Sequence, residues 1–264
     1  MARPIIALLT DFGSRDHYAG VMKGVMLGIA PDISLVDVLH DLPAHDIPFA
    51  SRELEATYKY FPPGTIFLVV VDPGVGTARR GLAAEVADWR FVAPDNGVLT
   101  GVFREVPPKK VVELSERRYA RPTVSRTFEG RDRFAPAAAW LAKGIQLPAL
   151  GRPVTDYVLL DLPQPVLEGE TLTGQVVRID RFGNVVTNLD RASCERLTGG
   201  AGAVQLRVGG TPIGRIVSTY ADLQPGEVGA LFGSTDHLEC AAPETSAAAQ
   251  LGVAVGDPVA LTRV

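Results

Sequence analysis

The sequence is poor in the residue types that build disulfide frameworks and metal sites. It contains 2 cysteines, Cys194 and Cys240, and 4 histidines among its 264 residues. Two widely separated cysteines form neither a disulfide framework nor a CxxC motif, which favours a reducing, cytoplasmic location. The histidines do not pair at HExxH spacing. We therefore predict no metal site.

Long apolar runs and an excess of one charge are also missing. The apolar run at residues 5–10 is too short for a membrane span or the core of a signal peptide. With 26 basic and 30 acidic residues the formal net charge is -4, and no basic stripe is present to cover phosphates. We expect neither a membrane nor a nucleic-acid partner. Walker-type loops, dinucleotide fingerprints and Gly-x-Ser-x-Gly elbows are absent from the sequence as well.

The first part of the chain alternates strand-like and helix-like segments. Continuous apolar runs with β-branched residues predict buried strands at residues 4–10 and 65–71, and a third strand, more polar on one side, is predicted at residues 33–39. Helical periodicity predicts helices at residues 18–29 and 46–60. This order predicts an α/β fold with a mostly parallel sheet flanked by helices, in an N-terminal domain of residues 1–150.

Two helical details can be predicted more closely. Gly20, Gly24 and Gly28 lie on one face of the first helix, and because glycine weakens a helix we expect another element to pack closely against them. A buried helix is predicted from Asp132 to Lys143, with Asp132 as its N-terminal cap and Gly144 ending it.

The second part of the chain has a different pattern. Residues 144–164 lack periodicity and resemble a linker. Short strands separated by Gly and Asp turns follow, at residues 171–180, 184–189, 204–208, 213–219, 237–241 and 258–263. They predict a smaller, antiparallel β-barrel-like domain over residues 165–264.

Two aspartates follow predicted strands of the first domain. Asp11 follows the first strand and Asp72 the third, and Arg79 comes shortly after the glycine-bearing loop Asp72–Gly76. Ligands of open α/β sheets bind beyond the carboxyl ends of the strands. There are two interpretations. In the first, the aspartates only cap the following loops or helices and the glycine-bearing loop is a structural turn. In the second, they belong to a site in which the Arg79 guanidinium keeps the Asp72 carboxylate ionised, so that it can orient a water.

Five motifs in order along the chain support the second interpretation. They are Thr10-Asp11-Phe12-Gly13, Val71-Asp72-Pro73-Gly74-Val75-Gly76-Thr77, Ala93-Pro94-Asp95-Asn96-Gly97, Thr127-Phe128-x-Gly130-Arg131-Asp132 and Asp180-x-Phe182-Gly183-Asn184-x-x-Thr187-Asn188. Together they closely resemble the S-adenosyl-L-methionine hydroxide adenosyltransferases, relatives of the fluorinase and chlorinase. The resemblance extends from Thr10 to about Leu251.

The resemblance implies an enzyme that hydrolyses S-adenosyl-L-methionine to adenosine and L-methionine, with water or hydroxide attacking the ribose C5′. It implies that Asp11 holds the ribose hydroxyls, that Asp72 positions the attacking water and that Arg79 is the partner of Asp72. It also implies a homotrimer, with the ligand between the large domain of one subunit and the small domain of its neighbour. Because S-adenosyl-L-methionine is the substrate, no separate cofactor is expected.

The resemblance assigns substrate contacts to the second domain as well. Asp180 would bind the methionine amino group, while Phe182 and Asn184 would contact the adenine. Tyr220 matches an aromatic residue that stacks on adenine, and Ser234 matches a polar contact to the ligand.

Three positions depart from the family pattern. Glu129 stands where the family hydrolases usually have a histidine that completes an Asp-Arg-His set. Asp236 stands where a glycine is usual, and Pro243 where an asparagine is usual. We count Glu129 among the catalytic residues, on the hypothesis that it accepts hydrogen bonds from Arg79; the alternative is that it shares a proton with Asp72.

Charge distinguishes hydrolysis from halogenation. Two unit charges about 4 Å apart at an effective dielectric near 20 interact by roughly 4 kcal/mol, so a site containing the Asp72 carboxylate repels halide and favours water. Two alternatives remain: a protein that binds S-adenosyl-L-methionine or adenosine without turnover, and an adenosyl halogenase.

Overall fold

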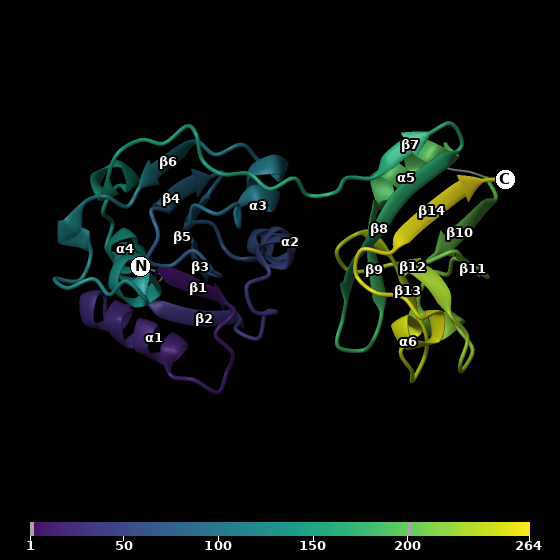
Figure 1. Cartoon of the computed structure of the whole chain (residues 1–264), viewed down its shortest axis with the longest axis horizontal. Helices are drawn as coiled ribbons and strands as arrows, with labels where there is room; N and C mark the ends of the chain where they lie inside the picture. Colours follow the sequence, from purple (N-terminus) through teal and green to yellow (C-terminus); the bar gives the residue numbers. More distant parts are fainter. Residues whose placement is uncertain (1–2, 200–201) are drawn as a thin grey trace. The chain divides into compact units, whose positions relative to one another are not determined.

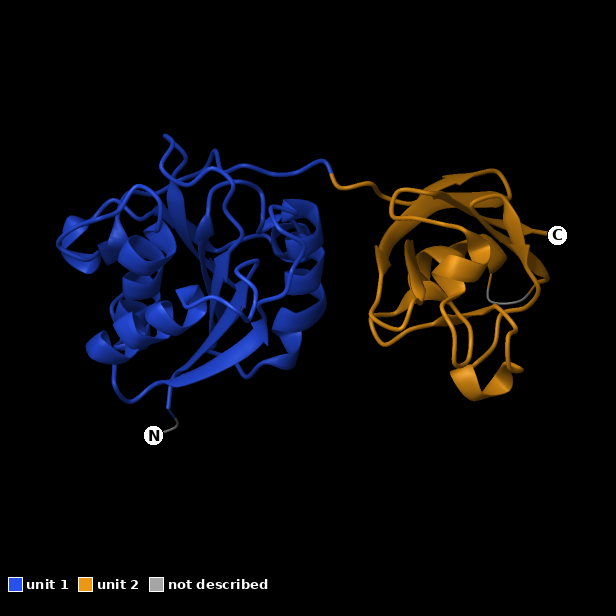
Figure 2. Cartoon of the chain, turned by 60° about the horizontal axis from the view of Figure 1, so that its bottom comes forward, with its two compact units in different colours: residues 1–161 blue, residues 162–264 orange. Residues whose placement is uncertain are grey.

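The structure is a computed structural model that describes residues 3–199 and 202–264. The chain folds as two compact units, Met1–Asp161 and Leu162–Val264 (Figure 2). Figure 1 labels their helices and strands. No helix within the described ranges is long and apolar enough to cross a membrane.

Unit 1 is built on a six-stranded sheet with the order β2-β1-β3-β5-β4-β6. Strands β2, β1, β3 and β5 are parallel, whereas β4 is antiparallel to both of its neighbours. The strands are β1 (Ile5–Thr10), β2 (Ser34–Leu39), β3 (Ile66–Val70), β4 (Gly81–Val86), β5 (Trp89–Pro94) and β6 (Lys110–Glu113). The predicted mostly parallel α/β sheet is confirmed.

Helices cover both faces of this sheet (Figure 1). The helices are α1 (Tyr18–Ile29) and α4 (Ala135–Ala142) on one face, and α2 (Ile47–Thr57) and α3 (Thr100–Glu105) on the other. Neighbouring residues of one strand therefore enter different cores: Leu8 of β1 packs with α1 and α4, and Leu9 packs with α2 and α3. Because both faces are covered, the strands need continuous apolar runs, as the sequence shows.

Asp46 begins α2, where its Oδ1 accepts a hydrogen bond from Phe49 N at 2.9 Å. The predicted helix to Tyr60 ends in a 3₁₀ turn, Tyr58–Tyr60. The packing prediction for the α1 glycines is wrong for this chain. A β-carbon at Gly20, Gly24 or Gly28 would meet nothing within 4 Å, because this face of α1 is exposed.

Residues 144–161 are part of unit 1. A 3₁₀ turn (Leu147–Leu150) is followed by a bridge between Pro153 and Val112 of β6. Further along, Val158 N donates to the buried Asp95 carboxylate at 2.8 Å. The predicted linker is therefore largely an irregular segment that hydrogen bonds hold against unit 1. Such a segment has no hydrophobic periodicity, so its sequence pattern resembles that of a linker.

Unit 2 is an antiparallel sheet with the order β11-β10-β14-β8-β9-β13-β12, and β7 pairs with β8. Its elements are β7 (Val166–Glu168), β8 (Thr171–Ile179), β9 (Val185–Asp190), α5 (Arg191–Thr198), β10 (Val204–Val208), β11 (Thr211–Ile213), β12 (Gly229–Phe232), β13 (His237–Ala241), α6 (Ala247–Leu251) and β14 (Pro258–Arg263). After β11 the chain reaches β12, where Val217 N donates to Ala230 O at 2.7 Å and nearly closes the sheet into a barrel. This confirms the predicted barrel-like fold.

Asp132 does not cap α4, contrary to the prediction. It lies inside a π-helical turn, Gly130–Phe134, that precedes α4, and its side chain is fully buried. Its carboxylate accepts hydrogen bonds from Ser125 N, Arg121 and Arg131 at 2.7–3.0 Å. Asp132 therefore fixes the loop before the turn onto the start of the helix. A capping pattern in sequence does not distinguish these two uses of a buried carboxylate.

Replacing Asp132 by alanine should destabilise unit 1. Burial opposes ionisation of Asp132, but hydrogen bonds from Arg131, Ser125 N and Arg121 outweigh it and lower its pKa below 3.8. We expect the free energy of unfolding to fall by about 2–3 kcal/mol at neutral pH, measured by urea denaturation. A lowered pKa stabilises the folded state above the unfolded value, and this contribution is lost as pH falls.

The difference between wild type and Asp132→Ala should therefore stay constant from about pH 5 to 8 and shrink below about pH 4. Asp156→Ala is the control, because Asp156 is 80% exposed and pairs with Arg80 at the surface. It should change stability by less than about 1 kcal/mol. Equal losses in the two variants would contradict the structural role assigned to Asp132.

Candidate active site

The loop after β3 carries Asp72 at the carboxyl end of the sheet. Asn96, from the loop after the neighbouring strand β5, donates through Nδ2 to Val71 O at 2.8 Å and joins the two loops. Within the loop, Thr77 Oγ1 donates to Gly74 O at 2.6 Å. Two motifs that are distant in sequence thus cooperate to hold Asp72 in place.

Gly76 must be glycine in this loop. Its φ is +78°, and a β-carbon there would lie 2.3 Å from the carbonyl oxygen of Arg126. Either constraint alone disfavours a side chain. The close approach brings the 126–129 segment against the Asp72 loop, so Glu129 comes close to Arg79.

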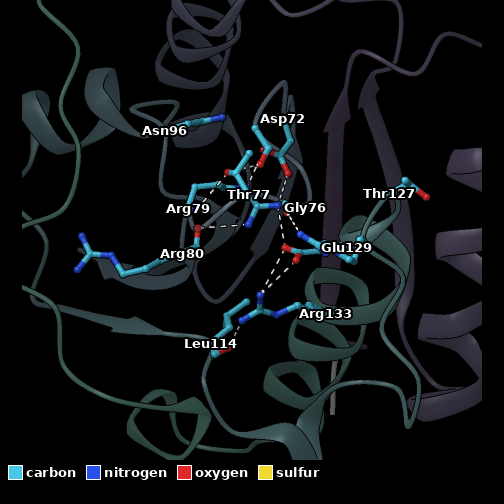
Figure 3. Close-up of polar contacts among 12 residues, drawn as sticks. Asp72, Gly76, Thr77, Arg79, Arg80, Asn96, Leu114, Thr127, Glu129 and Arg133 are labelled. Carbon is cyan, nitrogen blue, oxygen red and sulfur yellow. Dashed lines mark hydrogen bonds and ion pairs between the residues drawn. The ribbon is translucent and has the colours of Figure 1, made fainter.

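Arg79 connects the two acids (Figure 3). Its Nε donates to Asp72 Oδ1 at 2.8 Å, its Nη2 donates to Asp72 Oδ2, and its Nη2 also lies 2.8 Å from Glu129 Oε2. The side chains of Arg79, Asp72 and Glu129 are 9%, 5% and 10% exposed, respectively. Burial opposes the charge on Arg79, but hydrogen bonds and attraction from Asp72 and Glu129 outweigh it and raise the pKa of Arg79. The guanidinium therefore stays charged.

The acidic groups line a pocket of about 330 Å³ in unit 1. Asp11, Asp72 and Glu129 all contribute to its wall. Asp11 is held by His45, whose backbone N donates to Asp11 Oδ2 at 2.9 Å. The pocket thus has three carboxylates on its wall.

Aromatic side chains form another part of this wall. Phe12, Tyr18 and Phe128 pack against one another with ring centroids 5.2–5.9 Å apart. Aromatic faces beside carboxylates suit a ligand that is both apolar and positively charged, because a ring face attracts cations.

Unit 2 contains a second pocket, of about 480 Å³, lined by all five residues to which the family resemblance assigned substrate contacts. These are Asp180, Phe182, Asn184, Tyr220 and Ser234. They come from the β8–β9 turn, the segment before β12 and the β12–β13 turn.

The β8–β9 turn is built around Asp180. Its carboxylate accepts hydrogen bonds from Phe182 N at 2.8 Å, Asn184 N at 2.9 Å and Asn184 Nδ2 at 3.0 Å. A carboxylate has about four lone-pair sites, so acceptor capacity remains for a ligand. Gly183 has φ +84°, and a β-carbon there would clash with Ser246.

Phe182 and Tyr220 are unusually exposed for aromatic residues, at 77% and 48%. A phenyl ring that stays in water stabilises no core, so these rings are available to stack on a ligand.

Glu239 on β13 also lines this pocket and was not among the predicted site residues. It is 7% exposed and accepts a hydrogen bond from Tyr220 OH. Burial and this hydrogen bond raise the pKa of Tyr220 to about 12. The sequence signal that could have identified Glu239 is a glutamate between apolar residues of a predicted strand.

The structure accounts for one departure from the family pattern. Asp236 adopts φ +62°, the left-handed conformation that favours glycine, and its carboxylate pairs with Arg191 Nε at 2.7 Å. Asp tolerates this conformation better than most residues. Pro243 lies on the wall of the unit 2 pocket.

The predicted residues thus fall into two groups, one in each unit. Asp11, Asp72, Arg79 and Glu129 come together in unit 1. The remaining five line the unit 2 pocket. Among the residues with described positions, no three His, Cys, Asp or Glu side chains are placed to hold a metal ion.

Unit 1 is a helix-flanked sheet that carries an acid–arginine–acid cluster, and unit 2 is β-barrel-like. Together they indicate a two-domain enzyme. Residues 6–151 match the SAM hydroxide adenosyltransferase N-terminal domain, and residues 174–260 match the corresponding C-terminal domain. The chain belongs to the SAM hydroxide adenosyltransferase family.

Similar proteins extend over almost the whole chain. An (R)-S-adenosyl-L-methionine hydrolase of Thermus thermophilus is 40% identical, covering 98% of this chain and 99% of its own length. A hydrolase of the same name from Salinispora tropica is 36% identical, covering 98% of both chains. A fluorinase of Nocardia brasiliensis is 32% identical, covering 86% of this chain and 85% of its own.

Solved structures agree with this relationship. A crystal structure of a conserved protein from Thermotoga maritima has a TM-score of 0.92 and 36% identity, covering 98% of this chain and all of that one. A conserved protein from Thermus thermophilus has a TM-score of 0.79 and 37% identity, with the same coverage.

Proposed function

We propose that this chain hydrolyses S-adenosyl-L-methionine to adenosine and L-methionine. Water attacks the ribose C5′, a C–O bond forms, and the C–S bond breaks with its electron pair remaining on sulfur. The sulfonium becomes the neutral thioether of methionine, and the proton lost by water goes to the enzyme and then to solvent. Membership of the family and the similarity to proteins named as hydrolases support this reaction.

The observation that carries the proposal is the Asp72 carboxylate on the wall of the unit 1 pocket, held by two hydrogen bonds from Arg79. Methionine leaves without help, so the barrier lies in the weak nucleophile. Asp72 accepts the proton as the C–O bond forms and stabilises positive character on the water. Its fixed position aligns the water with the C–S bond.

Charge at the pocket favours water over halide. Asp11, Asp72 and Glu129 line the wall, whereas Arg79 lies behind the acids. A halide about 4 Å from one carboxylate is repelled by roughly 4 kcal/mol at an effective dielectric near 20, and attraction to the more distant Arg79 guanidinium offsets part of this repulsion. Water carries no such penalty, and the substrate sulfonium is attracted. On the same wall, Asp11 would hold the ribose hydroxyls.

The unit 2 pocket is proposed to bind the two ends of the same substrate. The exposed rings of Phe182 and Tyr220 would stack on the adenine, with Asn184 and Ser234 as polar contacts. Asp180 and Glu239 give this pocket two carboxylates, which suit the α-ammonium group of the methionine moiety.

We also propose that the chain acts as a cytoplasmic homotrimer in which unit 1 of one subunit and unit 2 of its neighbour form each site.

No cofactor besides the substrate is required, so EDTA should leave turnover unchanged. Both cysteines are unpaired, which suits a reducing compartment.

Asp72→Asn should reduce adenosine release by about 10²–10⁴-fold, because the proton acceptor is lost, while calorimetry still detects substrate binding. Chromatography should show adenosine and methionine in equal amounts from wild type. Binding without either product would favour the non-catalytic alternative, and a halogenated nucleoside formed in chloride or fluoride would favour the halogenase. Undiminished turnover by Asp72→Asn would remove Asp72 from the mechanism.

Glu239→Gln should raise KM about 10-fold or more while changing kcat less, because it removes a charge that binds the substrate away from the reacting carbon. Steady-state kinetics test this. The control is Glu227→Gln, since Glu227 pairs with Arg215 in the same unit and does not line the pocket. An unchanged KM for Glu239→Gln would exclude the contact.

Mixing two inactive variants tests the shared site. Asp72→Asn damages the unit 1 half, and a Phe182→Ala/Tyr220→Ala variant damages the unit 2 half. If the halves come from different subunits, co-refolded trimers should recover up to about a quarter of wild-type activity, because random assembly pairs intact halves at that frequency. Light scattering measures the mass of the refolded protein and thus its oligomeric state. Recovery in a monomeric sample would contradict the assembly.

A further inference from the structure

Glu129 contacts a second arginine that the proposed mechanism does not use. Arg133 Nη1 lies 3.4 Å from each carboxylate oxygen of Glu129, and Arg133 Nη2 donates to Leu114 O at 2.7 Å (Figure 3). The two residues are four positions apart, across the π-helical turn Gly130–Phe134. Arg133 is thus anchored to the residue that follows β6 and points at the carboxylate that contacts Arg79.

The result is a line of alternating charges, Asp72–Arg79–Glu129–Arg133. Asp72 and Arg79 by themselves form a neutral pair. Glu129 adds a buried negative charge that attracts the same guanidinium, and a buried charge without a counterion is unfavourable. Arg133 restores neutrality on the side of Glu129 away from Asp72.

We propose that Arg133 is a positioning residue for hydrolysis: it compensates the charge of Glu129, so that Arg79 keeps both of its hydrogen bonds to Asp72. This inference rests on the proposed function. Arg133 does not line the unit 1 pocket, and it acts on the attacking water only through Glu129, Arg79 and Asp72. Without Arg133, Glu129 draws Arg79 away from Asp72 and the water loses its alignment.

The proposal makes the effect of Arg133 conditional on the charge at position 129. Arg133→Met, which retains the apolar length of the side chain, should lower kcat about 10–100-fold and change KM less than about threefold, because the substrate contacts are intact. In a Glu129→Gln background the same Arg133→Met change should alter kcat less than about threefold, since an amide needs no counterion. The four proteins form a double-mutant cycle.

Two further variants separate charge from packing. Arg133→Lys keeps the positive charge and should return kcat to within about threefold of wild type. Arg121→Met is the matched control, because Arg121 pairs with the buried Asp132 but does not contact Glu129; it should leave kcat unchanged. Single-turnover assays with excess enzyme keep slow variants measurable, and circular dichroism verifies that each variant is folded.

Equal losses of kcat from Arg133→Met in the wild-type and Glu129→Gln backgrounds would overturn the proposal, because they would assign Arg133 a purely structural role. If the Glu129→Gln proteins are too slow to measure, Arg133→Lys decides: recovery supports the proposal and no recovery overturns it. A wild-type enzyme that releases no adenosine would instead refute the proposed function.

Discussion

The buried ion pair between Asp72 and Arg79 is the interaction on which the candidate site depends. The two groups are 5% and 9% exposed, so their charges are little screened and their separation strongly affects their energy. Holding them requires loops from β3 and β5, the close approach at Gly76 and the segment carrying Glu129. The loops after β3 and β5 and the segment carrying Glu129 are therefore organised around one guanidinium.

A second carboxylate beside this pair changes its electrostatics. Glu129 gives Arg79 two partners, which raises the pKa of Arg79 and favours its charged form. It also introduces competition for the same guanidinium. In the alternating arrangement Arg133 compensates the charge of Glu129, and the carboxylates of Asp72 and Glu129 line the pocket wall.

Division of the site residues between two units has a physical consequence. Unit 1 carries the carboxylates beside which water would attack a carbon bound to a sulfonium, and unit 2 carries exposed aromatic rings that are not packed into its core. A ligand such as S-adenosyl-L-methionine has matching parts: a sulfonium and ribose, an adenine, and an amino acid. The two groups of residues thus offer complementary contacts for the different parts of one such ligand.

The sequence alone determined the sheet strands with continuous apolar runs, the division into an α/β and a β part, and the acids at the ends of β1 and β3. Local patterns determine these features because burial on both faces and turn chemistry act over a few residues. Strand β4, the buried use of Asp132, the exposed α1 glycines, Glu239 and the Arg133–Glu129 contact were decided only by the tertiary structure. Their roles depend on which segments, distant in sequence, pack together, and the hydrophobic periodicity of the sequence does not predict those contacts.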